Sequence, residues 1–342
     1  MRLADVATAA GVSVPLVSRV LNGDPSVRAT DDTKARIETI AKELGYVADV
    51  AAKSLRMRRN GLIGLVVHDL SSPIHVELMR GVQAEASANA HFLVLGDVDE
   101  LLEDERAFRT FISGNRVDVL IVQGGHGAFD ERIAAGSRGL PTVIVNAPSR
   151  VERERISSVY PDEPAGTRLL TEHLLDLGHT RIGLVSGPRD ATTGMLRAQG
   201  VVEALERAGL TLRPEDVVHA DWTAAGGRDA FDDLVTRWSE GGDRPTAVIA
   251  GNSLIGIGVL GAAPRHGLSL PDDLSVAAVH DTWISDHLVP SLTTVSLPLF
   301  EMGAAAVRQL LAGSATATEI CVTDPPPLLH PRASTAPPAG SR

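Results

Sequence analysis

Cysteine, long apolar runs and common catalytic motifs are scarce or absent in this 342-residue sequence. The single cysteine, Cys321, excludes an internal disulfide and any metal site built from several thiolates, and we expect it to lie buried in a strand. No apolar run reaches the roughly 18 residues that span a bilayer. The first residues contain an early acid and no signal-peptide core. The sequence therefore predicts a cytoplasmic protein with no membrane partner.

Patterns that carry catalysis are also missing. No G-x-S-x-G, H-E-x-x-H or Walker A pattern occurs. Residues 256–261 formally match G-x-G-x-x-G, but a dinucleotide site needs its first glycine in a strand-to-helix turn. These glycines fall inside a predicted helix, where close helix packing explains them better. We therefore predict no enzyme activity and no cofactor.

The net charge of −11 is divided unevenly along the chain. Residues 1–60 hold ten basic and seven acidic side chains, whereas the remainder holds 22 and 36. A mildly basic start before an acidic body is suited to a nucleic-acid-binding head, because the body is repelled by phosphates while the head docks. The length favours roughly two domains of about 150 residues each.

Residues 3–22 carry the most informative local pattern. Their first half spaces four apolar residues three and four apart, as on one helix face: Leu3, Val6, Ala7 and Ala10. Gly11 then allows a turn, and Ser13 can cap a second helix whose first turn holds Pro15. In that helix we expect inward positions for Val17, Val20 and Leu21 and outward positions for Val14, Leu16, Ser18 and Arg19.

Two helices joined by a short glycine-containing turn match either a helix-turn-helix or an ordinary αα-hairpin. In a helix-turn-helix the second helix enters the DNA major groove. A third helix is predicted next, with Thr30 as its cap, an apolar face over residues 37–44 and Gly45 as its stop. Residues 46–59 are short, alanine-rich and basic, which is typical of a linker or a marginal helix.

From residue 61 the pattern changes to alternating strands and helices. Short β-rich apolar runs occupy residues 62–67, 92–96, 117–123, 141–146, 181–187, 247–251 and 275–281. Helical patterns include residues 76–90, 102–113, 164–177, 195–208 and 253–266. Strands buried on both faces indicate parallel sheets, and two consecutive sets indicate two doubly wound lobes. The proline-rich tail, residues 324–342, is predicted to be a surface strap or disordered.

The run LADVATAAGVSVPLVSRVLNG resembles the DNA-reading headpiece of the lactose/galactose repressor (LacI–GalR) family of bacterial transcriptional regulators. GLIGLVVHDLSSPIHVELMRGV, TEHLLDLGHTRIGLVSGP, PTAVIAGNSLIGIGVL and RASTAPP are similar to later segments of the family in their usual order. The resemblance covers nearly the whole chain. It implies an α/β protein with an all-helical helix-turn-helix headpiece and hinge helix, followed by a two-lobed, periplasmic-binding-protein-like core of two doubly wound parallel sheets.

The resemblance also implies the domain boundaries. These are residues 1–45 for the headpiece, 46–60 for the hinge or linker, 61–160 for the first core lobe, 161–289 for the second and 324–342 for the tail. The chain would cross between the lobes three times, so that residues near 290–323 complete the first lobe.

Carried over from the family's motif, the DNA-binding residues are Ser13, Val14, Pro15, Ser18, Arg19, Asn22, Ala52, Lys53 and Leu55. We expect Val14, Pro15 and Arg19 at base edges, since arginine offers paired donors to guanine, and the two serines at phosphates. The alternative for Arg19 is a surface salt bridge. Leu55 would wedge into a base step of the minor groove. Asp49, where asparagine is usual, should weaken the affinity of the hinge for phosphate.

An effector should bind in the crevice at the carboxyl ends of the strands. The family's pattern assigns it to Ser72, His75, Gln123, Asn146, Arg197, Trp222, Asn252 and His280. Arg197 offers forked donors and Trp222 a flat face, the alternative for Trp222 being a core or surface aromatic. His280 stands where the family usually has an acid, which weakens a simple sugar assignment. Metal is not predicted, because spacing supplies no third ligand beside the two histidines, and a polar or anionic ligand fits better.

Together these features predict a homodimeric transcriptional regulator, a repressor, that binds a palindromic operator in double-stranded DNA. A small molecule bound between the core lobes, a sugar or another polar metabolite, would control its operator affinity. The rival interpretation is a solute-binding module or small-molecule enzyme with a helical extension. A secretion signal or a catalytic constellation would favour the rival, and the sequence contains neither pattern.

Overall fold

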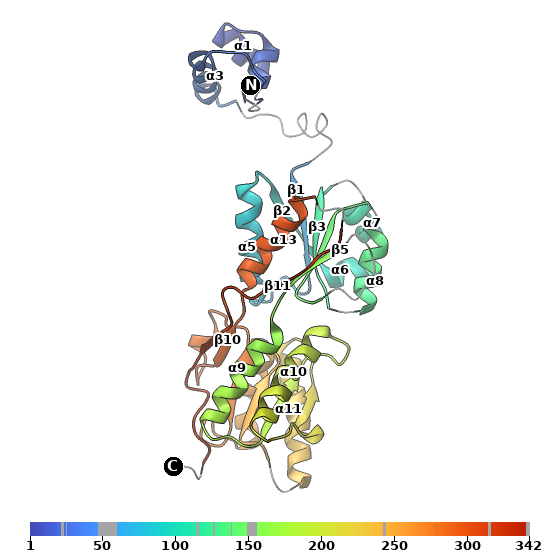
Figure 1. Ribbon diagram of the computed structural model, residues 1–342, viewed down its shortest axis with the longest axis vertical. Coiled ribbons are helices and arrows are strands. Elements are labelled where there is room, and N and C mark those ends of the chain that lie inside the picture. The colour runs from blue at the N-terminus through green and yellow to red at the C-terminus, as the bar shows by residue number, and fades with distance from the viewer. Residues whose placement is uncertain are drawn as a thin grey trace. The chain divides into compact units, whose positions relative to one another are not determined.

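The computed structural model describes residues 1–21, 24, 26–46, 60–113, 116–125, 127–137, 139–148, 156–241, 244–313 and 316–339. The chain divides into two compact units, Met1–Gly61 and Leu62–Arg342, each of which is described by itself (Figure 1). Among the described residues, no single helix has the length and apolar content to cross a membrane. The first two helices pass that test only together, as a pair bent by 106°.

The first unit is a small helical domain made of α1 (Leu3–Ala10), α2 (Val14–Leu21) and α3 (Asp31–Glu43). Gly11 ends α1 in the left-handed conformation, with φ at 64°, as its role in the turn requires. The hydroxyl of Thr30 accepts a 3.4 Å hydrogen bond from the Thr33 N–H and caps α3. One fully buried side chain from each helix anchors the shared core: Val6, Val17 and Ile37. The predicted helices, turn and cap are confirmed.

The expected orientation of α2 was wrong at two positions. Ser18 and Leu16 were expected to face outward, but Ser18 is only 9% exposed and Leu16 is half-buried against the headpiece core. The physical reason is helical spacing, because Leu16 lies one turn before Val20 and Ser18 one turn before Leu21. Leu16 and Ser18 therefore lie on the buried side of the helix, next to Val20 and Leu21. The exposed face of α2 is correspondingly narrower.

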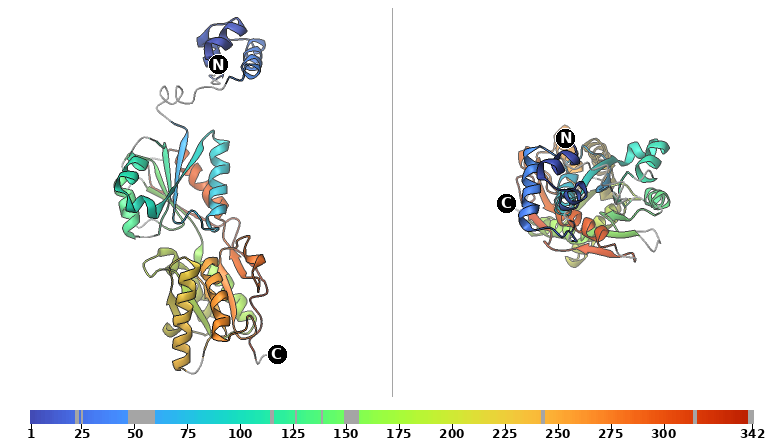
Figure 2. Two further views of the ribbon diagram at one scale, coloured as in Figure 1. Left: turned by 180° about the vertical axis from the view of Figure 1, so that it is seen from behind. Right: turned by 90° about the horizontal axis from the view of Figure 1, so that it is seen from above.

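The second unit contains two sheets, and the first forms one lobe with its helices. This sheet has the order β11-β5-β4-β3-β1-β2, and all its neighbouring strands are parallel. The strands are β1 (Leu62–Val67), β2 (Phe92–Asp97), β3 (Val119–Gln123), β4 (Thr142–Val145), β5 (Ile156–Pro161) and β11 (Glu319–Val322). The helices are α5 (His75–Ala88), α6 (Val98–Glu103), α7 (Glu105–Ser113), α8 (Gly127–Gly136) and α13 (Leu299–Leu311). Figures 1 and 2 show α5 and α13 on one face of the sheet and α6 to α8 on the other.

The second sheet has the order β12-β10-β9-β8-β6-β7 and forms the second lobe. Its strands are β6 (Ile182–Ser186), β7 (Val217–His219), β8 (Ala247–Ala250), β9 (Ser275–Val279), β10 (Thr293–Ser296) and β12 (Leu328–His330). The helices are α9 (Glu163–Asp176), α10 (Thr192–Arg207), α11 (Ala224–Gly241) and α12 (Ser253–Ala262), with short 3-10 turns at η1 (Pro214–Asp216), η2 (Ala263–His266) and η3 (Ser285–His287). β12 pairs antiparallel to β10, whereas the other neighbouring strands are parallel. Two doubly wound parallel sheets were predicted, and both are present, with β12 as an antiparallel edge strand that was not expected.

Strand pairing shows where the chain passes between the lobes. It crosses after β5, after β10 and after β11. We expected the return to the first lobe near residue 290, but β10 still belongs to the second sheet, because Thr293 to Val295 pair with β9. The tail is an ordered strap over residues 328–336. Ser334, fully buried, donates its hydroxyl to the Val276 carbonyl and accepts from the Thr293 N–H.

Three local predictions are corrected or sharpened by the structure. The expected helix over residues 102–113 is two helices, because Asp104 breaks the run and its carboxylate accepts from the N–H groups of Arg106 and Ala107. Cys321 is exposed on the edge strand β11 and not buried as expected. Gly258 lies inside α12, where a Cβ atom would come within 2.2 Å of the Ala224 carbonyl oxygen. Close packing of α12 on α11 thus accounts for this part of the G-x-G-x-x-G match.

Candidate DNA-reading surface and effector pocket

The second helix of the headpiece presents a compact exposed face. Pro15 and Arg19 are both exposed and lie one helical turn apart, and Val14 is 41% exposed beside them. The charge of Arg19 contributes to lowering the pKa of Asp24, after the hydrogen bonds from Ser26, but among the described residues Arg19 forms no direct ion pair of the kind weighed as its alternative. Ser13 is also exposed, directly before the helix. These four residues have the exposure that contact with a groove requires.

The other predicted DNA contacts divide into two groups. Ser18 is nearly buried, so its hydroxyl has far less free surface than a phosphate contact was expected to use. Asn22, Ala52, Lys53 and Leu55 lie outside the described residues, as does Asp49. Their assignments stay predictions.

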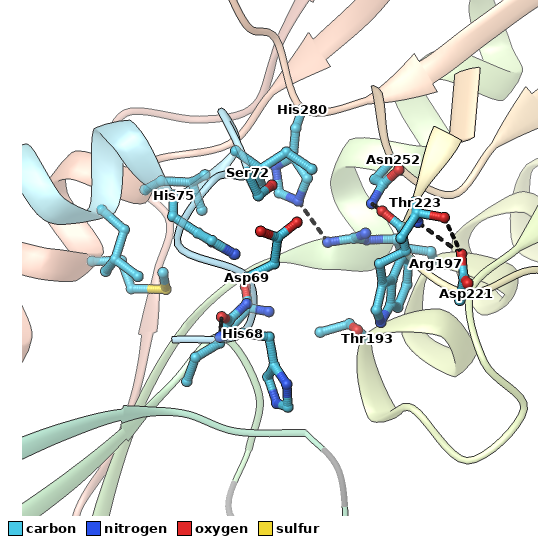
Figure 3. Close-up of a pocket in the computed structure, with 17 residues that line it drawn as sticks. His68, Asp69, Ser72, His75, Thr193, Arg197, Asp221, Thr223, Asn252 and His280 are labelled. Atoms are coloured by element: carbon cyan, nitrogen blue, oxygen red, sulfur yellow. Dashed lines mark hydrogen bonds between the residues drawn. The ribbon is translucent and has the colours of Figure 1, made fainter. Parts of the chain in front are cut away.

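All eight predicted effector residues line one cavity of about 320 Å³ in the second unit (Figure 3). They come from many elements: Ser72 and His75 at the start of α5, Gln123 and Asn146 at the ends of β3 and β4, Arg197 on α10, Trp222 in the β7–α11 loop, Asn252 before α12, and His280 after β9. The carboxyl ends of parallel strands converge here, as expected of a doubly wound fold. Both lobes contribute to the lining.

Three lining residues hold the left-handed backbone conformation, which side chains other than glycine seldom adopt. These are Asp69 at φ 50°, Asn146 at φ 82° and His280 at φ 69°, each within two residues of a strand's carboxyl end. Such a conformation costs on the order of 1–3 kcal/mol per residue and persists where surrounding structure imposes it. The backbone thus turns sharply at the end of three strands and directs side chains to one place.

Arg197 is the most heavily bonded side chain in the pocket. Its Nε and Nη2 donate to the two carboxylate oxygens of Glu163 at 2.7 and 2.8 Å, and Nη1 donates to the Gly251 carbonyl at 2.7 Å. The guanidinium also lies over the Trp222 ring, 5.3 Å from its centroid. Glu163 is fully buried and Arg197 is 3% exposed. The forked donors that were expected to face a ligand are therefore already paired with a protein carboxylate.

His280 and His75 are buried imidazoles held in the neutral form. Burial is the main cause that lowers the pKa of His280 well below its usual value, and the charge of Arg197 lowers it further. Burial also lowers the pKa of His75. Arg197 Nη2 donates to His280 Nε2 at 2.8 Å (Figure 3). Neither ring supplies positive charge to the pocket near neutral pH.

Two other predicted residues serve the pocket by holding its walls. The side-chain Oδ1 of Asn252 caps α12 by accepting from the Ile255 N–H at 2.7 Å, and the side-chain Nδ2 donates to the backbone carbonyl of Trp222 at 3.2 Å. The side-chain Oε1 of Gln123 accepts from the backbone N–H of His68 at 3.0 Å. Trp222 is half-buried against the second-lobe core and still lines the cavity.

Several residues that line the pocket were not predicted from the sequence. The remaining lining residues are His68, Asp69, Ile74, Leu78, Thr193, Asp221, Thr223, Leu299 and Met302. Asp69 and Asp221 each follow a strand by two residues, so the rule that ligands bind at the carboxyl ends of strands could have found them without the resemblance. Leu299 reaches the pocket only through the second crossing of the chain, which no local pattern reveals. Glu163 was missed because its partner lies 34 residues further along the sequence.

A helix-turn-helix headpiece and a two-lobed core with one polar pocket define a DNA-binding regulator with a ligand-binding domain. Comparison with known families agrees with this class. Residues 2–49 match the model of bacterial regulatory proteins of the lacI family, and residues 171–335 match a periplasmic binding protein-like domain.

Similar proteins extend the match over most of the chain. The ribose operon repressor of Escherichia coli K12 is 32% identical over 312 residues, covering 90% of this chain and 91% of that protein. Catabolite control protein A of Priestia megaterium is 30% identical, covering 90% of each chain. The HTH-type transcriptional repressor CytR of E. coli K12 is 29% identical, covering 90% and 88%. The chain belongs to the lacI family of bacterial regulatory proteins.

Solved structures show the same fold. A LacI family transcriptional regulator from Mycobacterium smegmatis superposes with a TM-score of 0.73 at 35% identity, covering 81% of this chain and all of that one. The lac repressor dimer bound to operator and an anti-inducer superposes with a TM-score of 0.75 at 25% identity, covering 98% and 99%. The predicted α/β architecture with a helix-turn-helix headpiece is confirmed.

Proposed function

We propose that the protein acts as a homodimeric repressor in the cytoplasm and that a small polar molecule in the pocket controls its affinity for a palindromic operator. The observation that carries this proposal is the convergence of eight predicted residues from both lobes on one cavity. Similar proteins support a ligand-controlled repressor. One of them is a ribose operon repressor, and a similar structure is the complex of the transcriptional regulator CelR with cellobiose. The described residues include no cluster of three His, Cys, Asp or Glu side chains able to hold a metal.

In the headpiece, the second helix would read the major groove. Arg19 would donate two hydrogen bonds to one guanine, and Pro15 and Val14 would make apolar contacts with neighbouring base edges. Ser13 and the first N–H groups of α2 would hold a phosphate. Two such heads in a dimer account for a palindromic site, because each head reads one half.

In the core, a ligand touching both lobes would favour the arrangement of the lobes that fits it best. A different arrangement changes how the two heads are presented to DNA, which couples two distinct sites in one molecule. An inducer would favour the DNA-free state and a co-repressor the bound state. The same pocket can hold either an inducer, which lowers operator affinity, or a co-repressor, which raises it.

The test is a binding assay in two stages. Selection from random double-stranded DNA should yield a palindrome, and a fluorescence anisotropy titration should then bind that palindrome far more tightly than shuffled DNA at equal salt. Ribose, cellobiose and nucleosides are added in turn at a fixed protein concentration. A compound that changes operator affinity, and no longer does so in an Asn146→Ala variant, supports the proposal. Failure to select any DNA sequence contradicts it.

A further inference from the structure

Glu163 and Arg197 form a closed pair behind the pocket. Four of the five N–H donors of the guanidinium are used: two on Glu163, one on Gly251 and one on His280. The side chains of Glu163 and Arg197 are 0% and 4% exposed, and Glu163 is not among the residues that line the cavity. The positive charge that lines this pocket is therefore balanced from behind by a buried carboxylate.

This pair fixes the tautomer of His280. A guanidinium donates hydrogen bonds and cannot accept them, so His280 Nε2 must be the acceptor and the ring proton must sit on Nδ1. Nδ1 is buried and has no hydrogen-bond partner among the residues that the structure describes. His280 is 4% exposed and lines the cavity. A buried N–H without a partner needs an acceptor, and a ligand in the cavity can supply one.

Two carboxylates add negative charge to the lining. Asp69 and Asp221 both line the cavity, and each hydrogen-bonds a nearby hydroxyl, of Ser71 and Thr223 respectively. Of the three histidines on the lining, His75 and His280 are neutral for the reasons given above. With Arg197 balanced by Glu163, these carboxylates repel an anion and leave an uncharged polar molecule at no disadvantage. This differs from the polar or anionic ligand expected from the sequence.

We propose that Glu163 makes the pocket select against anions, in favour of polar ligands that carry no negative charge. It balances Arg197 and holds it against His280 Nε2, so that the Nδ1–H of His280 is offered to an acceptor oxygen or nitrogen of the ligand. Glu163 is a positioning residue, because it acts through Arg197 and does not line the cavity. The inference rests on the proposed function in one respect, namely that the cavity binds an effector.

The first experiment reads the tautomer directly in the full-length protein. Long-range ¹H–¹⁵N spectra of protein labelled with ¹⁵N-histidine should show His280 protonated at Nδ1 and unprotonated at Nε2 at pH 7, with the signal assigned by its loss in His280→Asn. In Glu163→Gln this single-tautomer signature should be lost or broadened, because the arginine is released. A proton on Nε2 of the unaltered protein would overturn the proposal.

The second experiment uses inorganic phosphate as the anion probe. Unaltered protein and the control Glu172→Gln, an exposed glutamate on the same helix, should show no His280 shift up to about 10 mM phosphate. Glu163→Gln should bind phosphate at least tenfold more tightly, since an unpaired guanidinium is a strong oxyanion site. Phosphate binding at His280 in the unaltered protein, or no gain in a folded Glu163→Gln protein, contradicts the selectivity.

A third measurement needs no variant and covers the case in which Glu163→Gln does not fold. Ribose and ribose 5-phosphate are titrated against the unaltered protein by calorimetry. Selectivity is supported if the neutral sugar binds at least tenfold more tightly, and overturned if the phosphorylated sugar binds as well. If neither sugar binds, that result counts against a pentose effector in the proposed function, while the tautomer and phosphate results still decide the selectivity.

Discussion

The two functional regions of this protein use their side chains in opposite ways. On α2, Pro15 and Arg19 are exposed, and the fold of the headpiece does not depend on them. In the pocket, Arg197 and Asn252 are buried and already bonded to the protein. A surface that reads DNA can therefore vary with little cost in stability, whereas a change in the pocket alters binding and folding together.

The largest expected effect is in the pocket, for Arg197→Met. Removing the guanidinium leaves Glu163 buried and unpaired, which should lower the free energy of unfolding by about 3–5 kcal/mol. Urea unfolding followed by tryptophan fluorescence measures this, because all three tryptophans lie in the second unit. The control is Arg207→Met on the same helix, whose side chain is 63% exposed and whose loss should cost less than about 0.5 kcal/mol. Equal losses for the two variants would show that the buried pair has no special role.

The matching change in the headpiece is Arg19→Ala. We expect operator affinity relative to random DNA to fall by about 1–3 kcal/mol, roughly five- to 150-fold, because a bidentate guanine contact is lost. Stability should stay within about 0.5 kcal/mol of the unaltered protein. Arg36→Ala, an exposed arginine on α3, is the control and should weaken both kinds of DNA alike or not at all. If the operator-to-random ratio is unchanged in Arg19→Ala, base reading by this residue is wrong.

Helix caps allow the comparison to be made with similar chemistry in both regions. Thr30→Ala removes an exposed cap and should cost the headpiece about 0.5–1 kcal/mol. Asn252→Ala removes a buried cap that also holds the Trp222 carbonyl, so the core should lose about 1–2 kcal/mol. Thermal unfolding of the full chain, with circular dichroism for the headpiece and fluorescence for the core, separates the two losses. A larger loss at Thr30 than at Asn252 would reverse the expected order.

A pH dependence is also expected, and it is confined to the core. The pKa of His280 is lowered by burial and then by Arg197 and His75, so the folded protein binds fewer protons there than the unfolded chain. Its stabilising contribution is complete above the unfolded pKa of about 6.5 and is lost as the pH falls below it, at no more than about 1.4 kcal/mol per pH unit. Urea midpoints at pH 5.5 and 7.5 measure the loss.

His280→Asn should flatten this pH dependence. Asparagine tolerates the left-handed backbone, can accept from Arg197 and does not titrate. The exposed His287→Asn serves as the control and should leave the profile unchanged. A His280→Asn profile as steep as that of the unaltered protein would assign the titration to other groups, such as His75 or His179, whose pKa values are also lowered by burial.

The pocket residues were assigned from the resemblance to the family, and their positions also agree with a geometric rule. Asn146 and His280 stand directly after buried apolar runs, and parallel strands bring such positions to one edge of a sheet. The partner of Arg197 could not be found in this way, because the bond to Glu163 depends on how α9 and α10 pack and not on spacing along the chain. Cys321 was expected to lie buried in a strand because it is a lone thiol, but its strand β11 is at the edge of the sheet and the residue is exposed. On α2 the burial of Ser18 was missed, since eight residues define a helix face only loosely.

The crossing of the chain between the lobes has a consequence for the order of synthesis. Both sheets receive their last strands, β11 and β12, from the chain after residue 318. The first lobe is not complete until β11, and the second until β12, has left the ribosome. The headpiece, by contrast, has all its core residues within the first 46 positions. A nascent chain therefore carries a finished DNA-reading domain well before it has a finished sensor.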